Sequence, residues 1–131
     1  MSKFAEFMKK NKKARPNVKY KATKSLCNEN GEPLEWEIQP ITSARNEAIR
    51  RECTKDGSLD FWQYKIKLLC QSVVFPDLTN ADLQDSYGAN SEEELVYAMV
   101  DDPREFDAFV NFAISAGDTE DIGSITEEAK N

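Results

Sequence analysis

The chain has 131 residues, of which 40% are hydrophobic, and a formal net charge of −7. This length suits one domain, and no apolar run approaches the roughly 20 residues that span a bilayer. Histidine is absent, which removes the commonest general base near neutral pH and the commonest metal ligand. No constellation of lysines or carboxylates typical of catalysis replaces it. We therefore predict a protein that is not an enzyme, with no catalytic, cofactor-binding or metal-binding residue.

The cysteines and the first residues indicate the compartment. Cys27, Cys53 and Cys70 match no zinc-binding spacing, and an odd number of cysteines cannot all pair within one chain. They are expected to be free, mostly buried thiols in a reducing environment. The N-terminal stretch MSKFAEFMKKNKKARP lacks the continuous apolar centre of a secretory signal. We expect the protein to stay in the cytoplasm.

Charge is unevenly distributed along the chain. Residues 1–24 carry nine basic side chains and one acid, whereas residues 77–131 carry fifteen acids and two basic side chains. Such asymmetry is typical of proteins with charged partners or with a solvated, charged tail. We predict a basic N-terminal arm over residues 1–16. Its segment KFAEFMKKNKK places two phenylalanines and a methionine at the spacing of a short amphipathic helix.

Residues 17–39 are expected to form a β-hairpin. The segment NVKYKATKSLC alternates apolar residues with lysines, and LEWEI alternates apolar residues with glutamates. Asn30-Gly31 between them is typical of a tight turn. The lysines of the first strand are expected to face the glutamates of the second, which would stabilise the pair.

Residues 42–117 are expected to form a compact bundle of about five short helices. Several polar residues precede apolar periodic runs and are candidate N-caps: Thr42 or Ser43, Asp60, Thr79 or Asn80, Ser91 and Asp102. The run DFWQYKIKLLCQSVV is apolar nearly all the way round, so we expect a central helix. The preceding TKDGS is predicted to be a loop, and Gly117 is predicted to end the last helix.

The predicted fold class is α+β and predominantly helical, with the hairpin followed by the helices. Residues 17–117 form the single predicted globular domain. Residues 118–131 are acidic, lack a core-forming pattern and are expected to be a disordered tail. Within the domain, PDLTNADLQDSYG is explained by local structure. Pro76 stops one helix, a cap starts a short one, and Gly88 sits where a left-handed residue is favoured.

The order of these segments resembles the XkdN-like tail assembly chaperones of phages and prophages. The resemblance covers residues 17–117: IRREC, the aromatic-rich helix, VVFPDLTNADLQDSYG and EEELVYAMVDDPREFDAFVNFAISAG. Its most characteristic piece is Pro-Asp-Leu, then Leu83-Gln84-Asp85 and Tyr87-Gly88. The resemblance implies a cytoplasmic chaperone that coats the hydrophobic tape measure protein until tail tube subunits polymerise around it. The tail tube protein is a second implied partner, and the family has no catalytic residues.

Two aromatic residues are candidate partner contacts because they lie off the predicted core stripes of their helices. Tyr97 is not on the face of Leu95 and Met99, and Phe112 is not on the face of Phe106 and Ile114. The alternative is that each covers a second core face. If they are contacts, alanine at both positions is expected to leave the fold intact and to weaken partner binding.

Two rival functions are consistent with the composition. A small structural protein of the virion, in the tail or at the head-tail joint, would have a similar sequence and would remain in the finished particle. A nucleic-acid-binding protein would use the cations of the basic arm on phosphates and Phe4, Phe7 and Tyr20 on bases. The acidic remainder of the chain would repel a phosphate backbone, which disfavours this rival. The sequence leaves open whether the chain forms a homo-oligomer.

Overall fold

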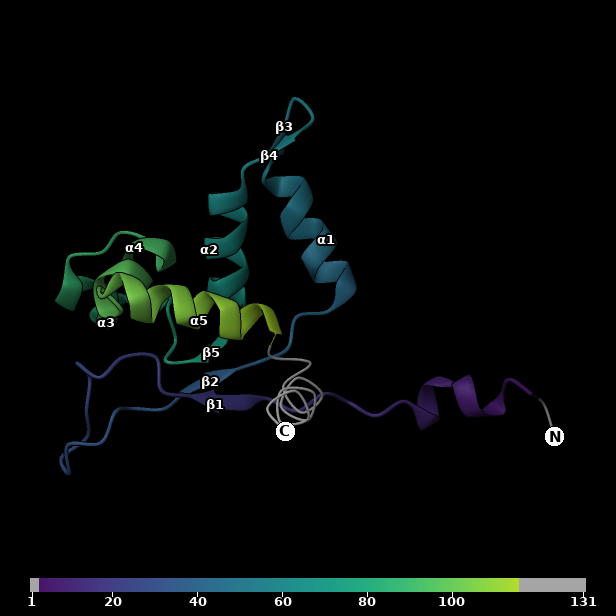
Figure 1. Cartoon of the computed structure of the whole chain (residues 1–131), viewed down its shortest axis with the longest axis horizontal. Coiled ribbons are helices and arrows are strands. Elements are labelled where there is room, and N and C mark those ends of the chain that lie inside the picture. Colours follow the sequence, from purple (N-terminus) through teal and green to yellow (C-terminus); the bar gives the residue numbers. More distant parts are fainter. Residues whose placement is uncertain (1–2, 116–131) are drawn as a thin grey trace, which may run out of the picture.

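The computed structural model describes residues 3–115, which form an α+β fold with five α-helices and a small antiparallel sheet (Figure 1). The predicted fold class is therefore confirmed. The predicted tail and the helix end at Gly117 lie outside the described residues. The sheet order is β1-β2-β5, and a separate two-stranded hairpin, β3-β4, connects the first two helices.

The predicted N-terminal hairpin is confirmed, although its strands are short. Strand β1 (Val18–Tyr20) pairs antiparallel with β2 (Trp36–Ile38), so that Tyr20 lies opposite Trp36. The Lys19 Nζ lies 3.1 Å from a Glu37 carboxylate oxygen, as the cross-strand charge pattern predicts. The connection between the strands is long. It turns at Gly31, whose φ of 79° favours glycine.

The third strand corrects the predicted end of the central helix. Helix α2 (Phe61–Ser72) stops before the two valines that were assigned to it, and Val73–Phe75 forms strand β5 on the free edge of β2. The Gln39 backbone N–H donates to the Ser72 carbonyl at 2.8 Å and begins this pairing. β-Branched valines favour an extended backbone, and Pro76 disfavours helical geometry at the residue before it.

The segment predicted as a loop before α2 is a β-hairpin with a two-residue turn. Strand β3 (Thr54–Lys55) pairs with β4 (Ser58–Leu59). The two residues between them, Asp56 and Gly57, have φ values of 51° and 80°. Two consecutive positive φ values define the turn that suits a tight hairpin, and Asp-Gly is a preferred sequence for it. The prediction of a plain loop was therefore wrong.

The helices begin at the predicted caps. Thr42 caps α1 (Ser43–Glu52), Asp60 caps α2, Asn80 caps α3 (Ala81–Tyr87) and Ser91 caps α4 (Glu92–Met99), each accepting a hydrogen bond from a first-turn backbone N–H. Asp102 accepts from the Arg104 N–H at 2.8 Å and starts α5 (Pro103–Ser115). These bonds satisfy donors that a helix start otherwise leaves unpaired.

Helix α2 is central, as predicted, and packs against α1, α4 and α5. Helix α5 lies over the sheet, where the buried Phe109 ring meets the Trp36 ring edge-on, with centroids 5.1 Å apart (Figure 1). Trp36, Leu69, Leu95 and Phe109 are among the fully buried side chains of the main core. A smaller cluster around Ile49 joins α1 to α2.

The N-terminal arm extends away from this body (Figure 1). The predicted amphipathic helix is replaced by two short 3-10 turns, Ala5–Phe7 and Lys9–Asn11, which are separated by an extended Met8. None of the residues 3–16 is buried. A short helix without tertiary contacts is unstable in water, which explains why the arm shows only single turns.

Candidate partner-binding site

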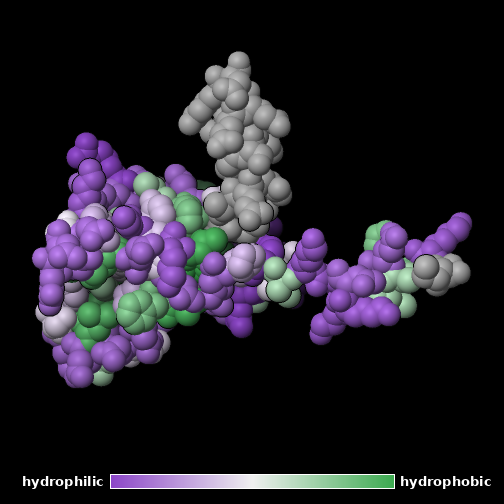
Figure 2. All heavy atoms as spheres, turned by 90° about the horizontal axis from the view of Figure 1, so that it is seen from below, coloured by the Kyte–Doolittle hydropathy of each residue, from purple (hydrophilic) through white to green (hydrophobic). Residues whose placement is uncertain are grey.

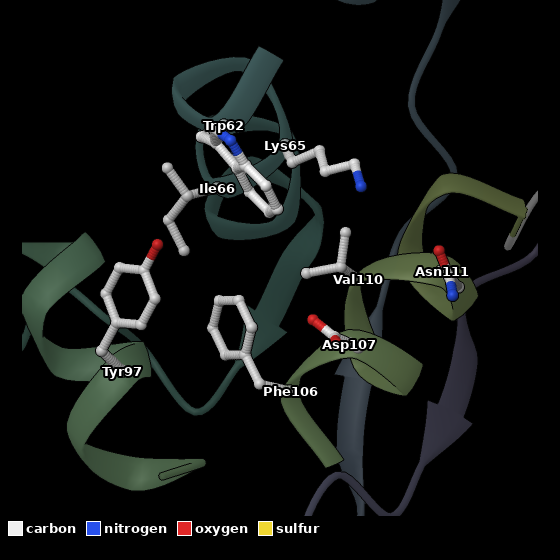
Figure 3. A pocket seen from close by; sticks show the side chains of 8 residues that line it. All are labelled: Trp62, Lys65, Ile66, Tyr97, Phe106, Asp107, Val110 and Asn111. Atoms are coloured by element: carbon white, nitrogen blue, oxygen red, sulfur yellow. The ribbon is translucent and has the colours of Figure 1, made fainter. Parts of the chain in front are cut away.

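A groove of about 230 Å³ lies where α2, α4 and α5 meet (Figure 3). Two buried aliphatic residues lie at its base, Ile66 from α2 and Val110 from α5. Aromatic rings from all three helices surround it. The residues that line it are Trp62, Lys65, Ile66, Tyr97, Phe106, Asp107, Val110 and Asn111. The groove is therefore apolar at its centre and polar on one side.

Helix α2 supplies the most exposed ring of the groove. Trp62 is 73% exposed and the neighbouring Phe61 is 52% exposed, although both are large apolar residues. The Lys65 ammonium lies 4.5 Å from the Phe61 ring centroid and 5.3 Å from that of Trp62. Such cation–π contacts hold exposed rings in place without covering them. The first turn of α2 thus presents an aromatic surface to the solvent.

Helices α4 and α5 supply the opposite wall. The Tyr97 ring stacks on the Phe106 ring, with centroids 4.7 Å apart and 14° between the ring planes. Tyr97 remains 51% exposed, and Figure 3 shows its hydroxyl pointing toward Ile66 across the groove. The stack joins the two helices and leaves one face of the tyrosine open. This wall is preformed and can accept another apolar surface.

The structure does not bring the two predicted contact residues together. Tyr97 lies in the groove, whereas Phe112 packs on the sheet side of α5, where its ring stacks on Tyr20 at 4.2 Å between centroids. Phe112 is half-buried and joins the main core. Trp62 and Phe106 were missed as site residues. The sequence did contain a signal for Trp62, because its helix is apolar nearly all the way round. If neighbouring helices do not cover every side of such a helix, some of its apolar residues are exposed to solvent.

Asp107 is the acid that lines the groove, and further acids lie on α4 and at the start of α5, outside its lining. Burial, and then the neighbouring carboxylates of Glu93 and Asp77, raise the pKa of Glu92. The Lys67 ammonium lies 3.9 Å from Glu93 and partly balances this charge. Hydrogen bonds from backbone N–H groups, chiefly that of Arg104, lower the pKa of Asp102. These shifts follow from capping and crowding of acids, so they do not require a catalytic role.

The buried thiols are also accounted for by packing. Burial raises the pKa of Cys70 to about 12 and also raises the pKa of Cys53, so both are protonated at neutral pH. Residues 3–115 contain no group of three acidic or cysteine side chains arranged to hold a metal ion. No helix in the same range is long and apolar enough to cross a membrane.

The surface of the molecule carries both hydrophobic and hydrophilic residues. Figure 2, which views it from below, shows green hydrophobic residues emerging on the body among purple hydrophilic ones. Hydrophilic residues predominate along the arm in the same view. Several large apolar residues outside the groove are exposed, among them Phe75 at 63%. Apolar surface surrounded by polar residues is typical of a protein-binding site.

Comparison with known families identifies the chain. Residues 4–130 match the family model described as phage XkdN-like tail assembly chaperone protein, TAC. The chain belongs to this family. The match confirms the resemblance predicted over residues 17–117 and extends it into both terminal segments. The family acts in the assembly of phage tails, so its partners are proteins of the tail.

Individual relatives agree with the family match. The phage-like element PBSX protein XkdN of Bacillus subtilis (strain 168) is 23% identical over 124 residues, which cover 87% of this chain and 84% of that protein. The crystal structure of the protein YqbN superposes with a TM-score of 0.79 at 18% identity. That superposition covers 89% of this chain and 97% of YqbN and shows a shared fold.

Proposed function

We propose that this chaperone binds the tape measure protein of the tail through the α2–α4–α5 groove and keeps it soluble until the tail tube forms. The observation that carries the proposal is the exposed aromatic pair of the groove, Trp62 and Tyr97, on a chain that belongs to a tail assembly chaperone family. The proposed site of action is the cytoplasm of the bacterial host. The tail tube protein is a second proposed partner.

The shape of the groove suits an amphipathic helix. Such a helix presents apolar residues at i, i+3, i+4 and i+7, and it docks by inserting them between aromatic walls. Trp62 and Tyr97 supply two walls, and Ile66 and Val110 supply an apolar base. Tape measure proteins are long and helical, so many short segments of one would present this pattern.

The net charge of the chain supports a holding role. A chaperone that exposes apolar surface must itself resist aggregation, and a net charge of −7 favours solubility. Repulsion between like charges also keeps neighbouring copies apart when several of them bind one partner. Helices α4 and α5, which form part of the groove, also carry acids on their other surfaces, and these carboxylates favour the solubility of a complex.

Co-expression with the tail gene cluster tests the proposal. The tagged chain is purified from these cells, and its partners are identified by mass spectrometry. We expect the tape measure protein to be recovered and to be insoluble when the chaperone is omitted. Trp62→Ala combined with Tyr97→Ala should abolish recovery. Tyr87→Ala, which removes a partly exposed tyrosine on α3, is the matched control and should retain it.

The same experiment separates the rival functions. Finding the chain as a stable component of finished tails would make it a structural protein of the particle. If nucleic acid alone is recovered, and is lost when the basic arm is deleted, the rival function of a nucleic-acid-binding protein would be favoured instead. Soluble tape measure protein in the absence of the chain would contradict the proposed function directly.

A further inference from the structure

We infer that the N-terminal arm of one copy lies in the α2–α4–α5 groove of a second copy when no tail partner is present. The inference rests on the proposed function in taking this groove as the partner-binding site, and it adds a self-association that regulates access to it. Four features of the molecule carry it: the apolar residues of the arm, its charge, the acidity of the α3–α5 region and the direction in which the arm leaves the body.

The arm carries apolar side chains that its own structure does not cover. Phe7 is 84% exposed and Met8 is 52% exposed, and both lie in a stretch that forms only single 3-10 turns. If the arm becomes a helix, Phe7 and Met8 lie three and four residues after Phe4, so these three residues share one face. Docking supplies the tertiary contacts that a short helix needs. The arm therefore has the form of a helical ligand that is not yet folded.

The charges of the arm and of the groove region are complementary. Residues 3–16 contain six basic side chains and one acid, whereas residues 77–115 contain ten acids and Arg104 as the single basic residue. Asp107 lines the groove itself. Lys65 also lines it and keeps its positive charge over the Phe61 and Trp62 rings. The attraction is therefore between the basic arm and the acidic α3–α5 region as a whole, while the apolar face of the arm fits the groove itself.

The base of the arm is anchored so that the rest of the arm points away from its own body and toward another molecule. The Arg15 guanidinium donates to the Ile41 carbonyl at 2.9 Å, and the Asn17 amide donates to Glu37 at 2.7 Å. These bonds fix the base of the arm beside the sheet and the start of α1. Figure 1 shows the arm continuing away from the body along the longest axis, with α3 and α4 at the opposite end. Its extended direction leads away from its own groove.

An arm of one copy in the groove of the next is a head-to-tail contact. Such contacts use two different surfaces, so they close into rings or continue as open chains. The arm also shields the exposed aromatic rings until a partner helix displaces it. One groove then serves both interactions, and the amount of self-association should fall when a tail partner binds.

A complementation experiment with the full-length chain alone tests the inference. Phe7→Asp impairs the arm and keeps the groove, whereas Trp62→Asp impairs the groove and keeps the arm. Both side chains are exposed, so both variants should fold. We expect the unmodified chain to exceed its 14.9 kDa monomer mass in sedimentation equilibrium at low salt. Each variant alone should self-associate about tenfold or more weakly.

The mixture of the two variants is decisive. Phe7→Asp copies still offer a groove and Trp62→Asp copies still offer an arm, so an equimolar mixture should form a one-to-one complex that neither variant forms alone. Ala14→Asp adds the same charge to the arm but keeps its large apolar residues, Phe7 and Met8, and should still self-associate. Higher salt should weaken every complex, because part of the attraction is between charges.

Three results would overturn the inference. The first is an unmodified chain that stays monomeric at all concentrations. The second is a monomer in which deleting residues 2–14 increases collisional quenching of the tryptophan fluorescence. Such quenching reports on the exposed Trp62 because Trp36 is buried, and an increase would mean that the arm lies on its own body. The third is a mixture that fails to associate although the unmodified chain does. None of these experiments contains a tape measure protein, so their failure is distinct from failure of the proposed function.

Discussion

The rings of Tyr97 and Phe106 stack with 14° between their planes, and the contact fixes α4 against α5 at the groove. Only one face of Tyr97 is used in this stack, and half of its surface stays exposed. The two helices therefore present a rigid aromatic wall before any partner binds. A wall that is already ordered lowers the entropy cost of association.

Tyr97→Ala should separate binding from folding. The substitution removes an exposed ring and one stacking contact, so we expect the free energy of unfolding to fall by about 0.5–1.5 kcal/mol. Its affinity for the tape measure protein should fall by about tenfold or more. The measurement is a binding titration of the purified tape measure protein with the variant and with the unmodified chain. Tyr97→Phe keeps the stack and should behave like the unmodified chain. Unchanged affinity of Tyr97→Ala would remove this residue from the proposed site.

Phe112→Ala should act mainly on stability. Its half-buried ring stacks on Tyr20 and packs against the main core, so the free energy of unfolding should fall by about 2–3 kcal/mol in urea denaturation. Ile114→Ala, at a 48% exposed position on the same helix, is the control and should change stability by less than about 1 kcal/mol. A fully stable Phe112→Ala variant with weakened partner binding would instead make Phe112 a contact residue.

Features that depend on local chemistry were predictable from the sequence. The caps of all five helices, the pairing of hairpin lysines with glutamates, and the left-handed Gly88 each depend on residues a few positions apart or on simple alternation. The family resemblance was also carried by the order of such segments. These predictions needed no knowledge of which element packs against which.

Features that depend on distant segments were not predictable in the same way. Val73–Phe75 becomes a strand because β2, far earlier in the chain, offers a free edge, and the helical pattern before it continues without a break. Trp62 is exposed because α1, α4 and α5 cover other sides of its helix. The pattern of α2 showed that it was central, but it could not show which side the fold leaves open.

Gly88→Ala tests the left-handed residue that ends α3. Gly88 has a φ of 66°, and a methyl group added there would meet no atom within 4 Å. The cost is therefore one of backbone conformation, about 1–2 kcal/mol of unfolding free energy. Gly88→Asn should cost less, because asparagine tolerates left-handed geometry. Equal losses for both variants in urea denaturation would point to a packing role for this glycine.

Asp102 should contribute to the acid sensitivity of the fold. Backbone N–H donors at the start of α5 hold its pKa below the ordinary value of 3.8. A carboxyl whose pKa is lower in the folded state stabilises that state fully above the unfolded pKa. The contribution is lost as the pH falls through the folded pKa.

Asp102→Asn tests this contribution, because the amide oxygen can still cap the helix but carries no charge. The free energy of unfolding of the variant should fall less steeply between about pH 6 and about pH 2 than that of the unmodified chain. Asp101→Asn removes a neighbouring acid that is exposed and is the control. An identical acid dependence of Asp102→Asn and the unmodified chain would exclude a role for this carboxylate in acid unfolding.

The three thiols should differ sharply in reactivity. Cys27 is exposed, whereas Cys53 and Cys70 are buried, and burial raises the pKa of Cys70 to about 12. The thiolate is the reacting form, so a buried and protonated thiol reacts only when the structure opens. With a chromogenic disulfide reagent near neutral pH, we expect rapid release of one equivalent from the native chain and of three in denaturant. Cys27→Ser should abolish the rapid phase. Rapid native labelling of Cys70 would show that α2 separates readily from α4, and the groove would then be a transient rather than a preformed surface.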